Sequence, residues 1–377
     1  MHKAWPMSNV LSLVSYKIFP AKSGGQKNIA IFYKYFHVFQ KLVCVTIREN
    51  DPSYADYTVL NILSNSSFRY INIFYFFTLK RLIKKYQITH VMIEHPYYGW
   101  LAILLKRSCK IKLVVHSHNI EGYRFKSVGK WWWRILLWYE KYVHKNADQT
   151  FCITEEDRQF MIQHFKVNPD RCTVTTYGID WNRSPTSDER RNAKKFLKEK
   201  YSIPTECVLY FFNGALDYKP NLDAIKAIAN KIIPLLKSSN LQYRIIICGK
   251  NLPAEMNELK EYAEIIYAGF VDDIEIYFKG TDVFINPITS GGGIKTKLVE
   301  ALGYDLTAVS TVTGAIGVNE EICDGKLLLV KDDEWELFAD RMKEAATNTG
   351  SIGAKYFEHF YWKNIARIAA EKLIVDS

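Results

Sequence analysis

Short apolar runs alternate along the chain with longer segments in which apolar residues recur every three or four positions. In the first half, the short runs have the composition of buried strands and span residues 10–15, 41–47, 90–93, 112–116 and 149–153. The longer segments at 27–40 and 71–87 have the periodicity of helices. Strands that alternate with helix-length segments predict βαβ units and a largely parallel sheet.

The same pattern begins again after a charged and polar stretch at residues 183–204, which we interpret as a linker with a bridging helix. We expect strands at 208–213, 243–248, 283–286 and 307–310, and helices at 221–236, 295–302 and over most of 334–376. A chain of 377 residues exceeds the size at which a single core stops growing. We therefore expect an α/β protein with two doubly wound, Rossmann-like domains at residues 1–182 and 205–355.

Cysteine usage and apolar run lengths bear on the compartment. The seven cysteines are odd in number, widely spread and without a C-x-x-C pair, which favours a reducing environment. Residues 1–20 lack the apolar core and small-residue cleavage site of a signal peptide. The most apolar run, at residues 71–79, is too short to cross a bilayer. We expect a soluble, cytoplasmic protein.

The positive charge is concentrated in the first half of the chain. Residues 1–150 hold 22 Lys and Arg against 7 Asp and Glu, whereas residues 151–377 hold 28 against 33. This asymmetry points to an anionic partner for the first half, such as a phosphorylated acceptor, an anionic lipid surface or nucleic acid. A basic face that is merely solvated is an equally good interpretation of charge alone.

A strand, three glycines and a helix follow one another at residues 283–302. The glycines at 291–293 lack Cβ atoms, so their N–H groups can approach an anion closely, and the helix N-terminus adds positive potential. Lys297 and Glu300 share one face of that helix. They could thus place a cation beside the phosphates and a carboxylate beside the ribose of a nucleoside diphosphate. A tight turn with a surface ion pair is the commoner meaning of an isolated triple glycine.

Two other glycine-containing loops follow expected strands, where open α/β sheets bind ligands. Gly214 would let the backbone approach a phosphate, and Lys219 could pair with it. The loop at residues 20–27, with Gly24 and Gly25, could form a lid over the same ligand. Taken alone, each loop fits an ordinary βα turn equally well.

A cluster of polar residues follows the expected strand at 112–116. The segment His116-Ser117-His118-Asn119-Ile120-Glu121 contains two histidines, an amide and a carboxylate. A histidine at the carboxyl end of a strand can act in acid–base chemistry or orient a substrate. A structural histidine is the alternative, and the clustering makes the two about equal.

The order and spacing of these segments resemble the family-4 retaining glycosyltransferases of the GT-B fold across nearly the whole chain. The similar stretches are the Gly24-Gly25 loop, HNIEGYRF, FCITEED, YGID, FNGALDYKPN, GFVDD, DVFINP, GGGIKTKLVEAL, STVTGAIG and the closing YFEHFYWKNIA. The resemblance implies two domains that face each other across a cleft, with a C-terminal helix at residues 356–377 that crosses back to the first domain.

The resemblance also implies a role for individual residues around a nucleoside-diphosphate-sugar donor held mainly by the second domain. The residues expected to act in catalysis are His118, Lys219, Lys297 and Glu300. The other residues expected at the donor are Gly24, Gly25, Gly214, Phe270, Val271, Gly291, Gly292, Gly293, Ile294, Lys295 and Thr296. Asn119 and Glu121 are expected on the acceptor side.

Two departures from the family pattern bear on these roles. Many members carry two glutamates eight positions apart, but here Gly292 stands at the partner position of Glu300, as in the GGG-loop subgroup. Tyr177 stands where Asn is common. The family is metal-independent and this chain contains no D-x-D motif, so we expect neither a metal nor another cofactor.

The function that follows is transfer of a sugar, with retention, to a glycan or lipid-linked acceptor during synthesis of a cell-surface polysaccharide or glycoconjugate. Lys219, Lys297 and the glycine amides would stabilise the leaving diphosphate, whose oxygen would take the acceptor proton. A nucleotide-sugar epimerase and a catalytically idle binding protein are alternatives on the same architecture. Nucleic acid, suggested by charge alone, is not expected as a partner.

Residues 123–145 mix Trp and Tyr with Lys and Arg, as helices at membrane interfaces do. Helical aromatic stripes are more often buried, so we expect these aromatic residues in the core, with the basic residues on the solvated side. A peripheral contact with an anionic membrane, which would bring the enzyme to a lipid-linked acceptor, is the alternative.

Overall fold

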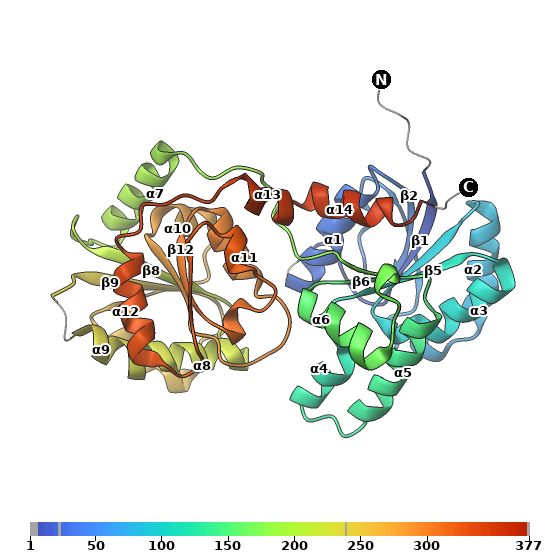
Figure 1. Cartoon of the computed structure of the whole chain (residues 1–377), viewed down its shortest axis with the longest axis horizontal. Coiled ribbons are helices and arrows are strands. Elements are labelled where there is room, and N and C mark those ends of the chain that lie inside the picture. The colour runs from blue at the N-terminus through green and yellow to red at the C-terminus, as the bar shows by residue number, and fades with distance from the viewer. Residues whose placement is uncertain (1–6, 22–23, 238–239, 375–377) are drawn as a thin grey trace. The chain divides into compact units, whose positions relative to one another are not determined.

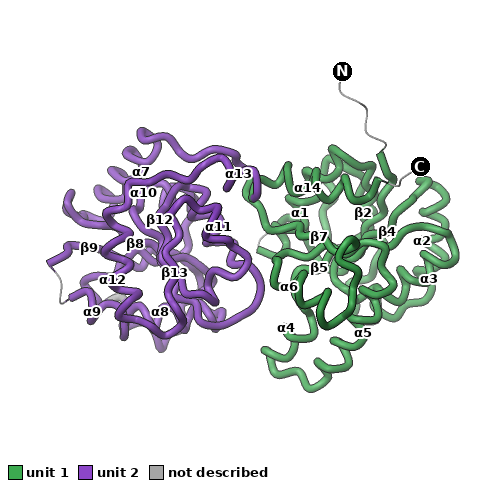
Figure 2. The backbone as a smooth tube through the Cα atoms, viewed as in Figure 1, with its two compact units in different colours: residues 1–180, 360–377 green, residues 181–359 purple. Residues whose placement is uncertain are grey.

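The computed structural model describes residues 7–21, 24–237 and 240–374. The chain divides into two compact units, of which the first comprises residues 1–180 and 360–377 and the second residues 181–359 (Figure 2). No helix in the described part of the chain is both long and apolar enough to span a membrane.

The first unit is built on a parallel sheet of seven strands in the order β3-β2-β1-β4-β5-β6-β7 (Figure 1). The strands are β1 (Asn9–Val14), β2 (Lys41–Ile47), β3 (Thr58–Leu63), β4 (His90–Glu94), β5 (Lys112–Ser117), β6 (Gln149–Cys152) and β7 (Cys172–Val174). Apolar residues fill the central strands on both faces, as expected for a parallel sheet that helices cover on both sides.

The helices of the first unit connect these strands, and the last returns from the end of the chain. They are α1 (Gly24–Phe36), α2 (Phe74–Lys85), α3 (Gly99–Cys109), α4 (Glu121–Ser127), α5 (Trp133–Asn146), α6 (Glu155–Phe160) and α14 (Trp362–Glu371). The helix α14 packs along α1, where the Trp362 ring meets the Phe32 ring edge-on at 6.5 Å (Figure 1). Residues far apart in sequence therefore complete one core.

The second unit contains a parallel sheet of six strands in the order β10-β9-β8-β11-β12-β13. Its strands are β8 (Val208–Asn213), β9 (Tyr243–Cys248), β10 (Ile265–Gly269), β11 (Val283–Asn286), β12 (Thr307–Thr311) and β13 (Leu327–Val330). Its helices are α7 (Ser187–Lys200), α8 (Lys219–Ala227), α9 (Ile233–Lys237), α10 (Glu275–Gly280), α11 (Thr296–Gly303) and α12 (Trp335–Ala345), and α13 (Ala354–Phe360) ends at the boundary between the units. A π-helical turn at Ile228–Ile232 joins α8 to α9. The expected fold class, two Rossmann-like α/β domains, is confirmed.

The charged segment expected to be a linker with a bridging helix is part of the second unit. Its helix α7 packs on α10 closely enough that a Cβ atom on Gly280 would lie 2.8 Å from the Ala193 carbonyl oxygen. Lys194 forms an ion pair with Asp282 at 2.5 Å. The polar sequence of α7 agrees with its position at the surface, because Leu197 is its only fully buried side chain.

In both sheets the order of the strands reverses at one internal position, although all strands stay parallel. Successive strands run outward from β1 in one direction and from β4 in the other, and β8 and β11 are related in the same way. The helices that leave two such strands diverge to opposite faces, which opens a crevice at the carboxyl ends of the strands. The β1/β4 and β8/β11 positions are therefore where the fold itself provides room for a ligand.

Candidate active site

The glycine loop follows β11 at the switch point of the second sheet. The side chain of Asn286, the last residue of β11, donates hydrogen bonds to Ser310 Oγ at 3.0 Å and to the Gly314 carbonyl at 2.9 Å, which fixes where the strand ends. Gly291 and Gly293 then adopt φ values of 87° and 71°. These values lie in the left-handed region, which costs little only for glycine.

Lys295 folds back over the loop and orients its peptides. Its Nζ donates to the carbonyl oxygens of Gly291 at 2.9 Å and Gly293 at 2.8 Å. Because C=O and N–H point in opposite directions across a trans peptide, the N–H groups of Gly292 and Ile294 face away from Lys295. No acceptor for these two N–H groups occurs among the residues that the structure describes. The loop therefore presents free donors to an anion.

Lys297, in the first turn of α11, reaches toward the end of β8. Its Nζ donates to the Asn213 carbonyl at 3.0 Å and to Asn221 Oδ1 at 2.9 Å, and lies 3.9 Å from the centre of the Phe212 ring. Burial holds the pKa of Lys297 well below its ordinary value and lowers that of Lys295 to about 8. Neither lysine has an acidic ion-pair partner within the described ranges. An anionic ligand would supply the missing counter-charge.

The start of α8 lies against the same loop. A Cβ atom on Gly291 would be 3.3 Å from both the Pro220 side chain and the Tyr218 hydroxyl, and one on Gly214 would be 2.5 Å from Asn221 Nδ2. Neither α8 nor α11 has a side-chain hydrogen bond at its N-cap residue. Two helix N-termini, each positive in potential, therefore meet the glycine loop and Lys297 at one place.

Lys219 and Glu300 belong to α8 and α11, the two helices that begin at this place. Lys219 is the first residue of α8, and its exposed ammonium group pairs with Asp223 at 2.6 Å. An exposed pair of this kind is weak enough to open for a ligand phosphate. Glu300 lies on α11 one turn beyond Lys297. Burial raises the pKa of Tyr304, and the carboxylates of Glu275 and Glu300 raise it further. Thr296, the first residue of α11, is half-buried beside them.

Phe270 and Val271 follow the edge strand β10. Gly269 ends that strand with φ 68°, and the Phe270 side chain that follows is 71% exposed. Val271 is half-buried. An exposed aromatic ring at a strand end offers a surface on which a base could stack, so the expected role of these two residues as neighbours of the base stays a prediction.

At the switch point of the first sheet, His118 joins a buried network centred on Glu94. His118 Nε2 lies 2.6 Å from Glu94 Oε2, and Nδ1 lies 2.7 Å from Asn28 Nδ2. His116 Nδ1 lies 3.2 Å from Glu94 Oε1, which also accepts a hydrogen bond from the Tyr33 hydroxyl. Both carboxylate oxygens of Glu94 are therefore fully engaged.

These partners determine the proton on His118. An amide Nδ2 can only donate, so Nδ1 of His118 accepts and Nε2 carries the hydrogen that it donates to Glu94. Burial lowers the pKa of His118 to about 4, which keeps the ring neutral at neutral pH. Burial would raise the pKa of Glu94, but the two histidines outweigh it and hold that pKa below its ordinary value. Glu94 is thus a charged carboxylate held by the hydrogen-bond donors around it.

A second buried carboxylate adjoins the first network. The His95 ring stacks on that of His118 with 4.6 Å between centres, and His95 Nδ1 lies 3.3 Å from Glu121 Oε1. Arg124 Nη2 donates to Glu121 Oε2 at 2.6 Å. Burial favours the neutral carboxyl, yet His95 and Arg124 keep the pKa of Glu121 low. Asn119, which lies between His118 and Glu121 in the sequence, is half-buried. Its backbone carbonyl accepts a hydrogen bond from Ser117 Oγ at 2.8 Å.

Gly24 and Gly25 are not in a loop. They form the first turn of α1, three residues before the expected start of that helix, and both are exposed. The N–H groups of a first helical turn need no partner inside the helix, so glycine is tolerated there. The expectation of a loop at these residues was therefore wrong. Lys22 and Ser23, which precede them, lie outside the described residues.

Glu94, His116 and His118 are close enough to hold a metal ion, since their ligand atoms lie within 4.8 Å of one another. Their hydrogen bonds already account for this geometry. His118 uses Nε2–H toward Glu94, and a metal would have to displace that proton. The expectation of a site without a metal stays a prediction.

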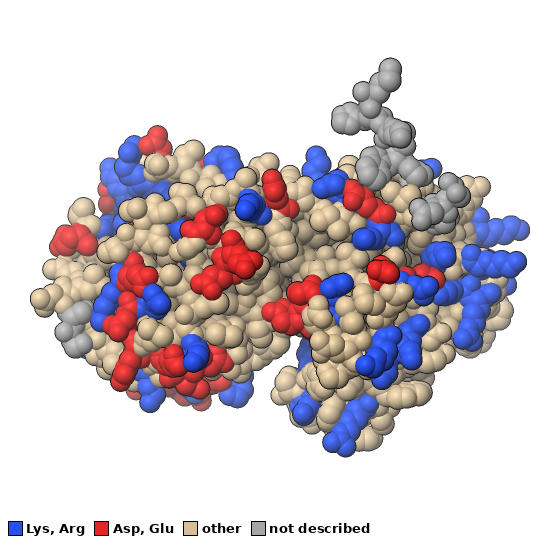
Figure 3. Space-filling model, in the orientation of Figure 1, with Lys and Arg blue, Asp and Glu red and all other residues tan. Residues whose placement is uncertain are grey.

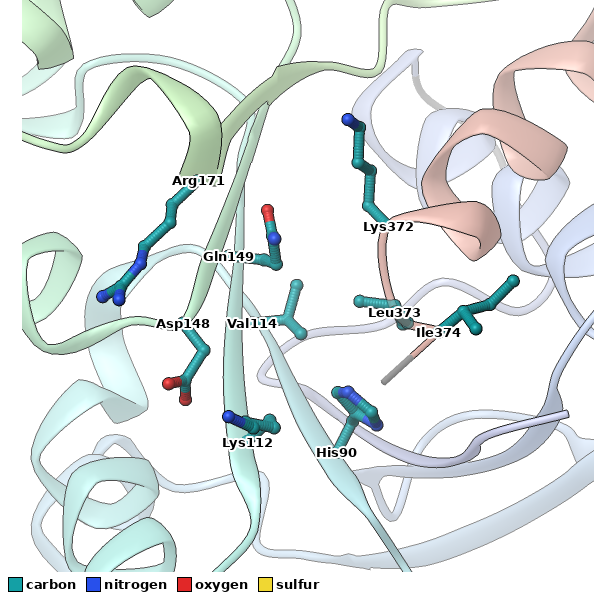
Figure 4. A pocket seen from close by; sticks show the side chains of 9 residues that line it. All are labelled: His90, Lys112, Val114, Asp148, Gln149, Arg171, Lys372, Leu373 and Ile374. Carbon is teal, nitrogen blue, oxygen red and sulfur yellow. The ribbon is translucent and has the colours of Figure 1, made fainter. Parts of the chain in front are cut away.

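A pocket of about 330 Å³ lies at the amino ends of strands in the first sheet (Figure 4). His90, Lys112 and Gln149, which line it, are the first residues of β4, β5 and β6. Ligands of parallel α/β sheets bind at the carboxyl ends of the strands, not at their amino ends. We therefore assign this pocket no part in the candidate site.

The structure brings several unpredicted residues into the candidate site. Glu94 and Asn28 hold His118, whereas Asn213 and Asn221 hold Lys297. Glu94 directly follows an expected strand, and this position is the one sequence signal that could have identified it. The asparagines carry no local signal, because their roles depend on strands and helices that are distant in sequence.

Comparison with known proteins agrees with this architecture. Residues 41–183 match the family described as Glycosyltransferase Family 4, and residues 208–348 match that described as Glycosyl transferases group 1. The chain belongs to these glycosyltransferases, which confirms the family resemblance and the GT-B fold. Retention and the GGG-loop subgroup stay predictions.

Two relatives are similar in sequence. An uncharacterised 44.6 kDa protein in the cps region of Klebsiella pneumoniae is 26% identical over 298 residues, which cover 74% of this chain and 70% of the relative. A UDP-Gal:alpha-D-GlcNAc-diphosphoundecaprenol alpha-1,3-galactosyltransferase of Escherichia coli is 23% identical over 268 residues, covering 68% and 66% of the two chains. The second relative is thus spanned over slightly less than two thirds of its length.

Two solved structures share the fold. HepE from Anabaena in complex with UDP has a TM-score of 0.72 at 15% identity and covers 97% of this chain and 99% of that chain. A glycosyltransferase from Rickettsia africae has a TM-score of 0.71 at 14% identity and covers 99% and 100%. At these identities the likeness establishes the fold alone.

Proposed function

We propose that this protein transfers a sugar from a nucleoside-diphosphate-sugar donor held by its second unit. The observation that carries the proposal is the pair Lys295 and Lys297, two half-buried lysines that lie beside free N–H groups and have no acidic ion-pair partner among the described residues. A buried uncompensated charge is costly, and proteins retain one where a ligand neutralises it. A diphosphate has the charge and the acceptor oxygens that this place lacks.

The chemistry follows from where negative charge develops. When the bond from the sugar to the diphosphate breaks, charge grows on the leaving oxygen, and Lys297, Lys219 and the amides of Gly292 and Ile294 would stabilise it. Fixed donors of this kind need little reorganisation during the reaction. The leaving diphosphate would take the acceptor proton on the same face of the sugar, which gives retention without a metal. Glu300 would bind the ribose.

The histidine network would orient the sugar end of the donor. Glu94 and Asn28 fix the position of the His118 ring, which stays neutral near neutral pH. Gly24 and Gly25, at the exposed start of α1, would contribute N–H groups to the donor, and Asn119 and Glu121 would lie toward the acceptor. We therefore assign His118 an orienting role rather than proton transfer.

Uridine is the base we propose for the donor. HepE, which shares the fold, binds UDP and UDP-glucose, and the galactosyltransferase relative uses UDP-Gal. The exposed ring of Phe270 is available for the base. The acceptor would be a lipid-linked glycan at the cytoplasmic face of a membrane, in cell-surface polysaccharide synthesis, by analogy with the diphosphoundecaprenol acceptor of that relative.

A thermal-shift panel of UDP, GDP, ADP, CMP and dTDP, with and without magnesium, tests the donor site. A ligand at a hundred times its Kd stabilises the folded state by about 2.7 kcal/mol, which is measurable as a rise in Tm. We expect UDP to raise Tm, with no dependence on magnesium. No shift with any of the five nucleotides would contradict the proposal.

A further inference from the structure

The helix α5 exposes an apolar face to solvent. Trp131, just before the helix, and Ile135, Trp138 and Tyr142 follow one another at spacings of four, three and four, which places them on one side. Their exposed fractions are 83%, 62%, 69% and 41%. We call these four residues the outer face of α5. The expectation that this aromatic stripe is core is therefore wrong.

The opposite side of α5 is firmly packed, so the helix cannot turn its outer face inward. Val143 lies so close to Gly99 of α3 that a Cβ atom there would be 2.1 Å from it. The buried carboxylate of Glu140 accepts hydrogen bonds from the N–H groups of Glu121 and Gly122 at 2.9 and 3.0 Å. The exposure of the outer face is thus a fixed property of the first unit.

Basic residues surround the outer face. The exposed ones on α4, α5 and the loop between them are Lys126, Lys130, Arg134 and Lys145, together with Arg124, which is ion-paired with Glu121. Between residues 123 and 146 the only carboxylate is Glu140, which is fully buried. Figure 3 shows Lys and Arg gathered over the side of the first unit where α4 and α5 lie. An apolar strip with a basic rim, in a segment (residues 123–146) without an exposed acid, fits an anionic partner.

We propose that the outer face of α5 and its basic rim dock on an anionic lipid bilayer. Tryptophan and tyrosine favour the level of the headgroups, where their rings are half apolar and half wet, and the lysines and arginines around them would meet lipid phosphates. The inference rests on the proposed function in one respect only: a lipid-linked acceptor makes such docking useful. The surface itself is independent of the donor site.

Sedimentation of the full chain with vesicles tests the surface. We expect it to bind vesicles of phosphatidylcholine mixed with phosphatidylglycerol, and to bind phosphatidylcholine alone poorly. Trp131→Ala/Trp138→Ala should weaken binding to the mixed vesicles by about tenfold or more, given the apolar area removed. Val38→Ala/Tyr54→Ala, which removes two exposed apolar side chains elsewhere in the unit, should bind as the unaltered chain does.

Charge reversal separates the basic rim from the apolar strip. Lys130→Glu/Arg134→Glu should lose binding to the anionic vesicles as well, and added salt should weaken binding by the unaltered chain. Each variant should keep its Tm, because the altered side chains are exposed. Normal vesicle binding by both the tryptophan and the charge variants would overturn the proposal.

A second copy of the chain is the competing occupant. If the unaltered chain ignores anionic vesicles but forms a dimer that Trp131→Ala/Trp138→Ala dissociates, the surface is an interface between copies and the lipid proposal fails. Donor binding is measured in the same samples by the UDP shift in Tm. A missing UDP shift would contradict the proposed function and leave the vesicle result standing, so the two failures are distinguishable.

Discussion

Glu94 holds His118 Nε2 at 2.6 Å with one carboxylate oxygen and His116 Nδ1 at 3.2 Å with the other. Glu94 ends β4 and His116 lies opposite it on β5, so the register of two neighbouring strands fixes the arrangement. The ring of His118 is held by partners from β4 and α1, which makes its position insensitive to changes in its own loop.

Glu94→Gln should therefore disturb orientation rather than donor affinity. The amide group would place N–H atoms against a histidine N–H, and the ring of His118 would have to move. We expect kcat to fall by about tenfold to a hundredfold with the donor KM little changed. Steady-state kinetics measure this split, with Glu155→Gln, an exposed carboxylate on α6, as the control. A rise in KM alone would show that Glu94 acts through donor binding.

Lys297→Met should separate stability from function. The variant loses two hydrogen bonds but also a half-buried amino group that has no acidic ion-pair partner among the described residues, so we expect the unfolding free energy to change by no more than about 1–2 kcal/mol. The UDP shift in Tm should vanish and transfer should fall by about a hundredfold or more. Chemical denaturation and transfer assays measure the two effects. Near-normal transfer by a folded variant would remove Lys297 from the reaction.

Gly291→Ala and Gly292→Ala form a matched pair. Gly291 has φ 87°, so a methyl group there should lower the unfolding free energy by about 1 kcal/mol or more. A Cβ atom on Gly292 meets nothing within 4 Å, so that variant should keep its stability. It should nevertheless weaken UDP binding, because the methyl group would stand where the diphosphate approaches. Undiminished UDP affinity of Gly292→Ala would place the diphosphate elsewhere.

Donor binding should weaken as the pH rises through about 8. Burial lowers the pKa of Lys295 to about 8, so the free protein loses this charge above that pH and keeps it below. Isothermal titration with UDP between about pH 7 and pH 9.5 measures the effect. Lys295→Arg, which stays charged, should flatten the profile. An unchanged profile in that variant would assign the pH dependence to another group.

His144 should make the fold sensitive to acid. Burial lowers its pKa to about 3 in the folded state from 6.5, so the unfolded chain takes up the proton first. Stability should therefore fall as the pH drops from about 6.5 toward 3, by roughly 2–3 kcal/mol from this group at pH 4.5. Denaturant unfolding of His144→Gln beside the unaltered chain measures it. Equal acid dependence in the two proteins would contradict the assignment.

The sequence could predict what depends on periodicity and on glycine chemistry. The strands that end at Asn213 and Asn286 were expected within a residue, and so the loop at Gly291 was placed correctly after a strand. What it could not predict is which side of an amphipathic helix faces inward when both sides carry apolar residues. The helix α5 has Val143 on its buried side and Trp138 on its exposed side, and periodicity treats them alike.

The partners of the site residues were beyond reach for another reason. Glu94 lies beside His116 only because β4 and β5 are neighbours, and Lys297 reaches Asn213 only because α11 begins next to the end of β8. Such neighbours follow from strand order, which no local pattern contains. The turn of Lys295 back onto its own loop depends likewise on the φ angles of the two flanking glycines.

The return of α14 to the first unit has a consequence for synthesis. Residues 181–359 are continuous and can fold as soon as they leave the ribosome, whereas the first unit needs the helix that packs on α1 and contributes Trp362 to its core. Translation thus completes the N-terminal unit last. Until then the uncovered surface of α1, with Phe32 at its centre, is what a chaperone would find on the nascent chain.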